Sequence, residues 1–129
     1  MDAQTMCKRP YWVQRADYSS RDYPPVSLTD AEIALRGHNW QLELAFKRTL
    51  DASGEDACLP GIGFTADGEN SLAVLHICPG DDGSAHCFFQ QGTSICDGVE
   101  INPVGQYRLL QLFFRGDYNG VIRALEGNW

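Results

Sequence analysis

The sequence has no Lys or Arg between Thr49 and Tyr107, a long central part of a 129-residue chain whose net charge is −7. Unneutralised negative charge repels nucleic acids and anionic membranes, because both are bound through their phosphates. We therefore expect a basic protein partner and no direct binding of nucleic acid or membrane, although the same charge also serves solubility. The nine carboxylates of this stretch are Asp51, Glu55, Asp56, Asp67, Glu69, Asp81, Asp82, Asp97 and Glu100.

Long apolar runs are also missing. A membrane-spanning helix needs about 20 predominantly apolar residues, and no run in the sequence approaches that length. Residues 1–10 are polar and lack the apolar core of a signal peptide. The odd number of cysteines, without an export signal, argues for reduced thiols and a cytoplasmic protein. The five cysteines are Cys7, Cys58, Cys78, Cys87 and Cys96.

Phosphate-binding loops, dinucleotide fingerprints, nucleophile elbows and H-E-x-x-H motifs do not occur, nor does a C-x₂₋₄-C pair. We therefore predict no cofactor, no metal site and no catalytic residue. A small thiol or zinc enzyme stays open as an alternative, but nearby carboxylates disfavour a thiolate, and buried cysteines often act as small hydrophobic residues. The residues available to such an enzyme are His76, Cys78, His86, Cys87 and Cys96.

Residues 1–27 are punctuated by Pro10, Pro24 and Pro25. The segment is nevertheless rich in aromatic residues, which is unusual for a disordered tail. We interpret it as an irregular arm packed on the domain, with one short strand near residues 11–16. Aromatic and Arg residues are also typical of interface hot spots, so an interface is the alternative.

A helix is predicted after Ser27. Thr29 and Glu32 have the spacing of a capping box, and Gly37 interrupts the helical pattern, so one kinked helix and two helices meeting near Asn39 are both open. Residues 40–46 also alternate between apolar and polar, as a strand would. We favour a helix there, because Lys47-Arg48 lies near its expected end.

Three short apolar runs predict strands at residues 62–65, 72–77 and 85–90, and a fourth at residues 98–101. Residues 66–70 and 79–83 carry turn chemistry between these runs. Connections this short join antiparallel neighbours, so the predicted sheet is a three- or four-stranded meander with one face covered by helices. Asp-Gly is foremost a hairpin turn signal, which we favour over a calcium site.

The C-terminal third predicts a helical hairpin. Asn102-Pro103 is a suitable cap and first position, and Gly116-Asp117 marks a stop followed by a new cap. The string from Leu112 to Tyr118, with the apolar residues that follow it, is similar to the inter-helix turn of a tetratricopeptide repeat. That resemblance occurs once, whereas such arrays need several stacked copies, so it implies a helical hairpin only.

We therefore expect a single α+β domain over residues 1–129, with an N-terminal arm and helix, the antiparallel meander and the helical hairpin. The functional hypothesis is a small acidic, non-enzymatic inhibitor of the immunity or anti-defence type, which blocks a basic site of a nucleic-acid-handling toxin or effector. A secretion-type chaperone forming a homodimer is the alternative, because the chain resembles type III secretion chaperones in size, charge and coarse element order. The contact candidates are Asp67, Glu69, Asp81, Asp82, Asp97 and Glu100, with Trp12 or Trp40 as apolar anchors.

Overall fold

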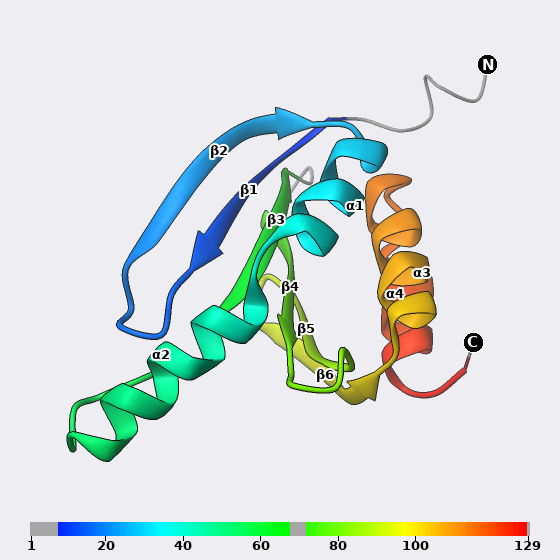
Figure 1. The fold of residues 1–129 in the computed structure, drawn as a ribbon. Helices are drawn as coiled ribbons and strands as arrows, with labels where there is room; N and C mark the ends of the chain where they lie inside the picture. Colours follow the sequence, from blue (N-terminus) through cyan, green and yellow to red (C-terminus); the bar gives the residue numbers. More distant parts are fainter. Residues whose placement is uncertain (1–7, 68–71, 129) are drawn as a thin grey trace.

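A computed structural model of the chain describes residues 8–67 and 72–128 (Figure 1). One antiparallel sheet, in the strand order β2-β1-β3-β4-β5-β6, is combined with four helices. The α+β, antiparallel character predicted from the sequence is confirmed. The elements are β1 (Arg9–Gln14), β2 (Ser20–Val26), α1 (Leu28–Gly37), α2 (Trp40–Ala52), β3 (Gly61–Asp67), β4 (Leu72–Pro79), β5 (Ala85–Gln91), β6 (Ser94–Ile101), α3 (Pro103–Phe114) and α4 (Tyr118–Leu125).

The predicted arrangement of an irregular arm and a three- or four-stranded meander is wrong. The N-terminal segment is a hairpin, β1–β2, whose first strand pairs antiparallel with β3 and extends the sheet to six strands. The pairing joins Tyr11 to Phe64, which are far apart in sequence, so no local pattern announces it. Pro24 and Pro25 are tolerated because β2 is an edge strand and because its register with β1 is irregular between Tyr23 and Val26, where neither proline has a paired partner.

Two helices, not one, follow the hairpin. Ser27, not Thr29, caps α1, and its hydroxyl accepts a hydrogen bond from the Asp30 N–H at 3.2 Å. His38 is extended and ends this helix, and the Asn39 side chain then caps α2 by accepting from the Leu42 N–H at 3.1 Å. Residues 40–46 are therefore helical. At each of the two caps a side-chain oxygen accepts from a backbone N–H that has no partner within its helix.

The C-terminal helices begin at the caps that the sequence indicates. The Asn102 side chain accepts from the Gly105 N–H at 2.8 Å, with Pro103 in the first turn of α3. Asp117 caps α4 by accepting from the Gly120 N–H at 2.9 Å. Gly116 between the helices has φ +77°, a left-handed conformation that favours glycine. Within the described part of the chain, no helix has the length and apolar character needed to cross a membrane.

The core lies between the sheet and α1, α3 and α4, which share one face of it (Figure 1). Alternate residues of the central strands point into this layer, as a pleated sheet requires. Complete burial of a large apolar side chain contributes about 1.5–3 kcal/mol, so this layer dominates the stability of the fold. The largest fully buried side chains include Phe64, Phe89, Phe113, Phe114, Ile62, Leu75, Ile77, Leu109 and Leu110.

The opposite face of the sheet carries aromatic side chains from three strands. Trp12 pairs with Gly63, Gly63 with His76 and His76 with Phe88, so these four positions form one row across the sheet. The Trp12 indole lies directly over Gly63, where an added Cβ would be 2.2 Å from the ring. A glycine is therefore needed at this position to leave room for the indole.

Replacement of Gly63 by Ala should displace the Trp12 indole and lower the free energy of unfolding by about 1–3 kcal/mol, the usual cost of overpacking. Gly37→Ala is the matched control, because a Cβ there meets nothing within 4 Å, and its expected effect is neutral or slightly stabilising. The measurement is urea unfolding followed by circular dichroism, with the midpoint compared at constant slope. Equal midpoints for wild type and Gly63→Ala would contradict the close packing.

Candidate functional site

Strand β6 forms one edge of the sheet and pairs with β5 on its inner side. A two-residue turn at Gly92 and Thr93 joins the two strands, and Gly92 has φ +60°, as the first central position of a type II′ hairpin turn requires. Among the described residues, no segment pairs with the outer side of β6. This strand therefore offers backbone groups at an open edge.

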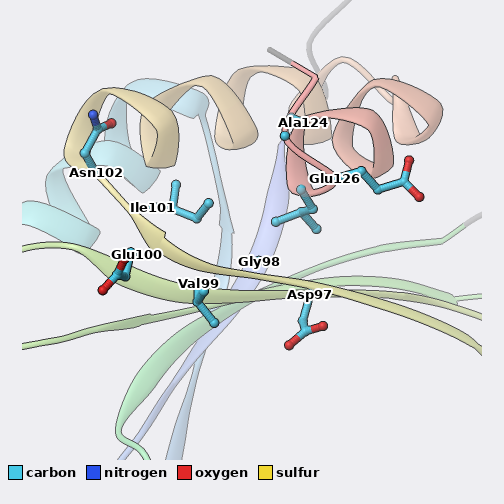
Figure 2. A pocket seen from close by; sticks show the side chains of 10 residues that line it. Asp97, Gly98, Val99, Glu100, Ile101, Asn102, Ala124 and Glu126 are labelled. Carbon is cyan, nitrogen blue, oxygen red and sulfur yellow. The ribbon is translucent and has the colours of Figure 1, made fainter.

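Side chains of β6 alternate between the two faces of the sheet. Asp97 and Val99 point away from the helices, and the irregularity at Glu100, where φ is +55°, then turns Ile101 toward them (Figure 2). Ile95, which pairs with Gln90, lies on the same face as Asp97, its neighbour two positions along the strand. The Ile95 and Val99 side chains are 68% and 64% exposed. Apolar groups and a carboxylate thus alternate along the exposed side of the edge strand.

Two adjoining hollows of about 540 and 500 Å³ lie between β6 and α4. Asp97 and Glu126 line both hollows, so the two form one continuous depression, which we call the β6 groove. Gly98 allows α4 to lie this close, because a Cβ there would be 3.1 Å from the Leu125 side chain and carbonyl oxygen. The apolar side chains on the helix side of the β6 groove are those of Phe89, Ile101, Ile122 and Leu125, whereas the Ile95 and Val99 side chains lie at its rim, on the opposite face of β6.

The β6 groove is electrostatically negative. Asp97, Glu100 and Glu126 border it, with the Asp97 carboxylate on the helix-free face of β6, and its described lining contains no Lys or Arg. Burial raises the pKa of the Cys96 thiol, and the carboxylates of Glu126 and Asp97 raise it further. The Asp97 carboxylate is held in place by a 2.9 Å hydrogen bond to His86 Nε2. The groove therefore combines an apolar floor with carboxylates that attract cations.

The acidic contact candidates do not all lie at one place in the structure. Asp97 and Glu100 line the β6 groove, and Asp82 lines a further hollow of about 340 Å³ that it shares with Glu100. Asp81, in the same turn as Asp82, contacts Arg48 at 3.4 Å. Asp67 pairs with Leu72 at the far end of the β3–β4 hairpin, away from the β4–β5 turn. Glu69 lies outside the described residues.

The two tryptophan candidates lie away from the β6 groove. Trp40 is only 9% exposed, and its indole N–H donates to the Leu35 carbonyl oxygen at 2.7 Å, so it has little surface for a partner. Trp12 lies on β1, separated from β6 by three intervening strands. Neither tryptophan is therefore an anchor within the groove.

Sequence reasoning missed Ile95, Val99 and Glu126, which lie at the groove. The alternation of Ile95, Asp97 and Val99 in a strand without Lys or Pro is a signal that could have found the exposed edge. Glu126 has no such signal, because its place beside β6 depends on how the α3–α4 hairpin folds back onto the sheet. No local sequence pattern predicts that α4 packs beside β6.

The cluster of Cys and His residues does not form one site. Cys87 faces the helices, whereas Cys78 and the two histidines His76 and His86 are on the opposite face of the sheet. Burial raises the pKa of both Cys78 and Cys87 to about 12, and burial lowers the pKa of His76. Both thiols and the imidazole of His76 are therefore neutral at pH 7. No group of three or more metal-ligating side chains occurs in the described ranges.

The chain was compared with known proteins at three levels. It matches no protein-family model, and the searches of curated proteins and of solved structures found no match.

The raised pKa values of Cys78 and Cys87 predict that iodoacetamide at pH 8 leaves both thiols unmodified in the native protein and modifies both in urea, because thiolate is the reactive form. The modified sites are identified by peptide mass mapping. A protease that cleaves after aromatic residues is needed, since no tryptic site lies between Arg48 and Arg108. Fast native labelling of either thiol would contradict the assignment and favour a thiol enzyme.

Proposed function

We propose that this protein is a non-enzymatic binding protein whose β6 groove holds a basic segment of a partner protein. The observation that carries this proposal is the β6 groove itself. It combines three carboxylates and no Lys or Arg in its described lining with exposed apolar side chains at an open strand edge. A Lys- or Arg-rich surface is complementary to it in charge, whereas a phosphate-rich ligand is repelled.

The two parts of the groove have different roles in this proposal. The carboxylates steer a basic partner during encounter and exclude acidic competitors, so they act on the association rate and on specificity. The apolar floor supplies contact area from which water is removed, and this area acts on the dissociation rate. Ile95 and Val99 add apolar contact area at the rim of the groove, where their side chains are exposed before binding.

An inhibitor is the kind of binding protein that this arrangement suits best. A protein that handles nucleic acid uses Lys and Arg to bind phosphates, and an acidic edge placed over those residues denies the substrate its site. The proposed partner is accordingly a nucleic-acid-handling toxin or effector, and the protein is of the immunity or anti-defence type. The turn that holds Asp81 and Asp82 would extend the contact beyond Glu100.

We further propose that the protein acts in a reducing, cytoplasmic compartment. Cys58, Cys78, Cys87 and Cys96 are free thiols in the structure, as proteins exposed to glutathione and thioredoxin keep them.

The proposal predicts that the double variant Glu100→Lys, Glu126→Lys loses its partner. Both side chains are exposed at the groove, and their reversal should weaken the complex on the order of tenfold or more, which corresponds to about 1.4 kcal/mol. The partner is first captured from lysate of the expressing cells and identified by mass. Its affinity is then measured by calorimetry at several salt concentrations, and the variant should show a weaker salt dependence.

Glu55→Lys, Asp56→Lys is the matched control, because it changes the net charge equally at two exposed residues in the loop after α2. It should retain the partner with nearly unchanged affinity. Equal losses in both double variants would reduce the effect to net charge and contradict a specific role of the β6 groove. A captured partner with an acidic or purely apolar contact surface would overturn the proposed function.

A further inference from the structure

We propose that the open edge of β6 binds its partner by strand addition: an extended basic segment pairs with residues 94–98 as a seventh strand and places alternate side chains in the β6 groove. This inference rests on the proposed function and specifies how the basic segment is held. Strand addition gives affinity through main-chain hydrogen bonds and specificity through pockets for alternate side chains.

The register of the β5–β6 hairpin determines which backbone groups are available. In a two-residue hairpin the residues that flank the turn, here Gln91 and Ser94, form a hydrogen-bonded pair, and pairs then alternate along the ladder. The pairs of Ile95 with Gln90 and of Asp97 with Phe88 are consequently the non-hydrogen-bonded ones. The N–H and C=O groups of Ile95 and Asp97 therefore point outward at the free edge.

The two edges of the sheet differ in how they are protected. Strand β2 carries consecutive prolines, Pro24 and Pro25, which remove backbone donors, and it carries the charged residues Arg21 and Asp22. Such features block pairing with another strand. Strand β6 has neither Pro nor Lys, and its only charged residues are Asp97 and Glu100. It is the edge on which an added strand would meet no missing donor.

The length of the regular edge is limited at one end. Glu100 has φ +55°, and the ladder is irregular where β5 residues 85–87 meet β6 residues 98–101. A bulge of this kind bends a strand and interrupts its pairing. The regular edge is therefore the segment 94–98, which is long enough for two pairs of outward hydrogen-bonding groups, at Ile95 and Asp97.

The chemistry on each face specifies the added segment. Side chains on the helix-free face would lie beside Ile95, Asp97 and Val99, so a Lys or Arg is favoured next to Asp97. An opposite charge at such a cross-strand position stabilises the pairing of the two strands. Side chains on the other face would enter the β6 groove, where Leu125 forms the floor and Glu126 lines the rim. The expected ligand is a short extended peptide of alternating basic and apolar residues.

A second copy of the chain is a poorer occupant than a basic peptide. Antiparallel pairing of two copies centred on Cys96 would place the two Asp97 carboxylates diagonally on the same face, and like charges there are destabilising. Each copy also carries a net charge of −7. Charge complementarity therefore favours a partner rich in Lys and Arg.

The test uses a displayed library of random nine-residue peptides, selected on the full chain at low salt. Selection should enrich peptides with alternating basic and apolar residues. The best of these is synthesised and its affinity measured for wild type, Ile95→Ala and Ile95→Pro. Proline removes the outward N–H without touching the hairpin ladder, so Ile95→Pro should weaken binding on the order of tenfold. Ile95→Ala keeps the N–H but removes most of the same side-chain contact, so the difference in affinity between Ile95→Pro and Ile95→Ala reports the lost main-chain hydrogen bond.

Amide hydrogen exchange on the wild-type chain provides the second measurement, independent of whether Ile95→Pro folds. Addition of the peptide should slow exchange at the amides of Ile95 and Asp97. Equal affinity of Ile95→Pro and wild type, or unchanged exchange at both amides, would overturn strand addition. If binding is still lost in Glu100→Lys, Glu126→Lys, the proposed function survives that result. Failure to enrich basic peptides, or a dimer in sedimentation that Ile95→Pro dissociates, would overturn both the basic ligand and its place at this edge.

Discussion

Aromatic packing between α3 and the sheet is the interaction on which the candidate site depends. The Phe113 ring contacts Phe89 at 6.2 Å between centroids, and Phe114 contacts Phe64 at 5.8 Å, both edge to face. These contacts fix α3 against β3 and β5, so the turn at Gly116 sends α4 back along the sheet toward β6. The carboxylate of Glu126 comes to the open edge only through this sequence of contacts. The groove proposed to bind a partner is thus built on the same residues that form the core.

A buried carboxylate provides a second link, between the N-terminal hairpin and the helices. Glu43 is 6% exposed and accepts hydrogen bonds from Arg15 Nε at 3.1 Å and from His38 Nε2 at 2.9 Å. A buried charge is tolerated when its oxygens are paired in this way. The contact joins the β1–β2 turn to the junction of α1 and α2, so the turn end of the hairpin that extends the sheet is held against the helices. The β1–β2 hairpin extends the sheet on the β3 side, and β6 is the edge strand on the opposite side.

Local features of the fold could be predicted from the sequence, and non-local ones could not. The caps at Asn102 and Asp117 depend on a side chain and a backbone N–H three residues away, and both are readable in the sequence. The pairing of β1 with β3 joins distant segments, and Pro24 and Pro25 argue locally against the neighbouring strand, so the sequence predicts an irregular arm where the structure has a hairpin. The sequence shows the acidic stretch, but it does not show which of its carboxylates lie close together in the fold. Asp97 and Glu100 share the groove with Glu126, while Asp67 lies at the other end of its hairpin.

The negative charge at β6 also bears on how an open edge strand avoids self-association and on which partner it is proposed to bind. An edge strand with exposed apolar residues and no Lys or Pro is a template for pairing with other chains. Asp97 and Glu100 on β6, with Glu126 beside it, repel a second copy and every acidic chain, which removes most competitors from the edge. A segment that supplies Lys or Arg reverses the sign of that interaction and gains the main-chain hydrogen bonds as well. Under the proposed function, protection against self-association and preference for a basic partner therefore have one origin, the carboxylates placed along and beside one strand.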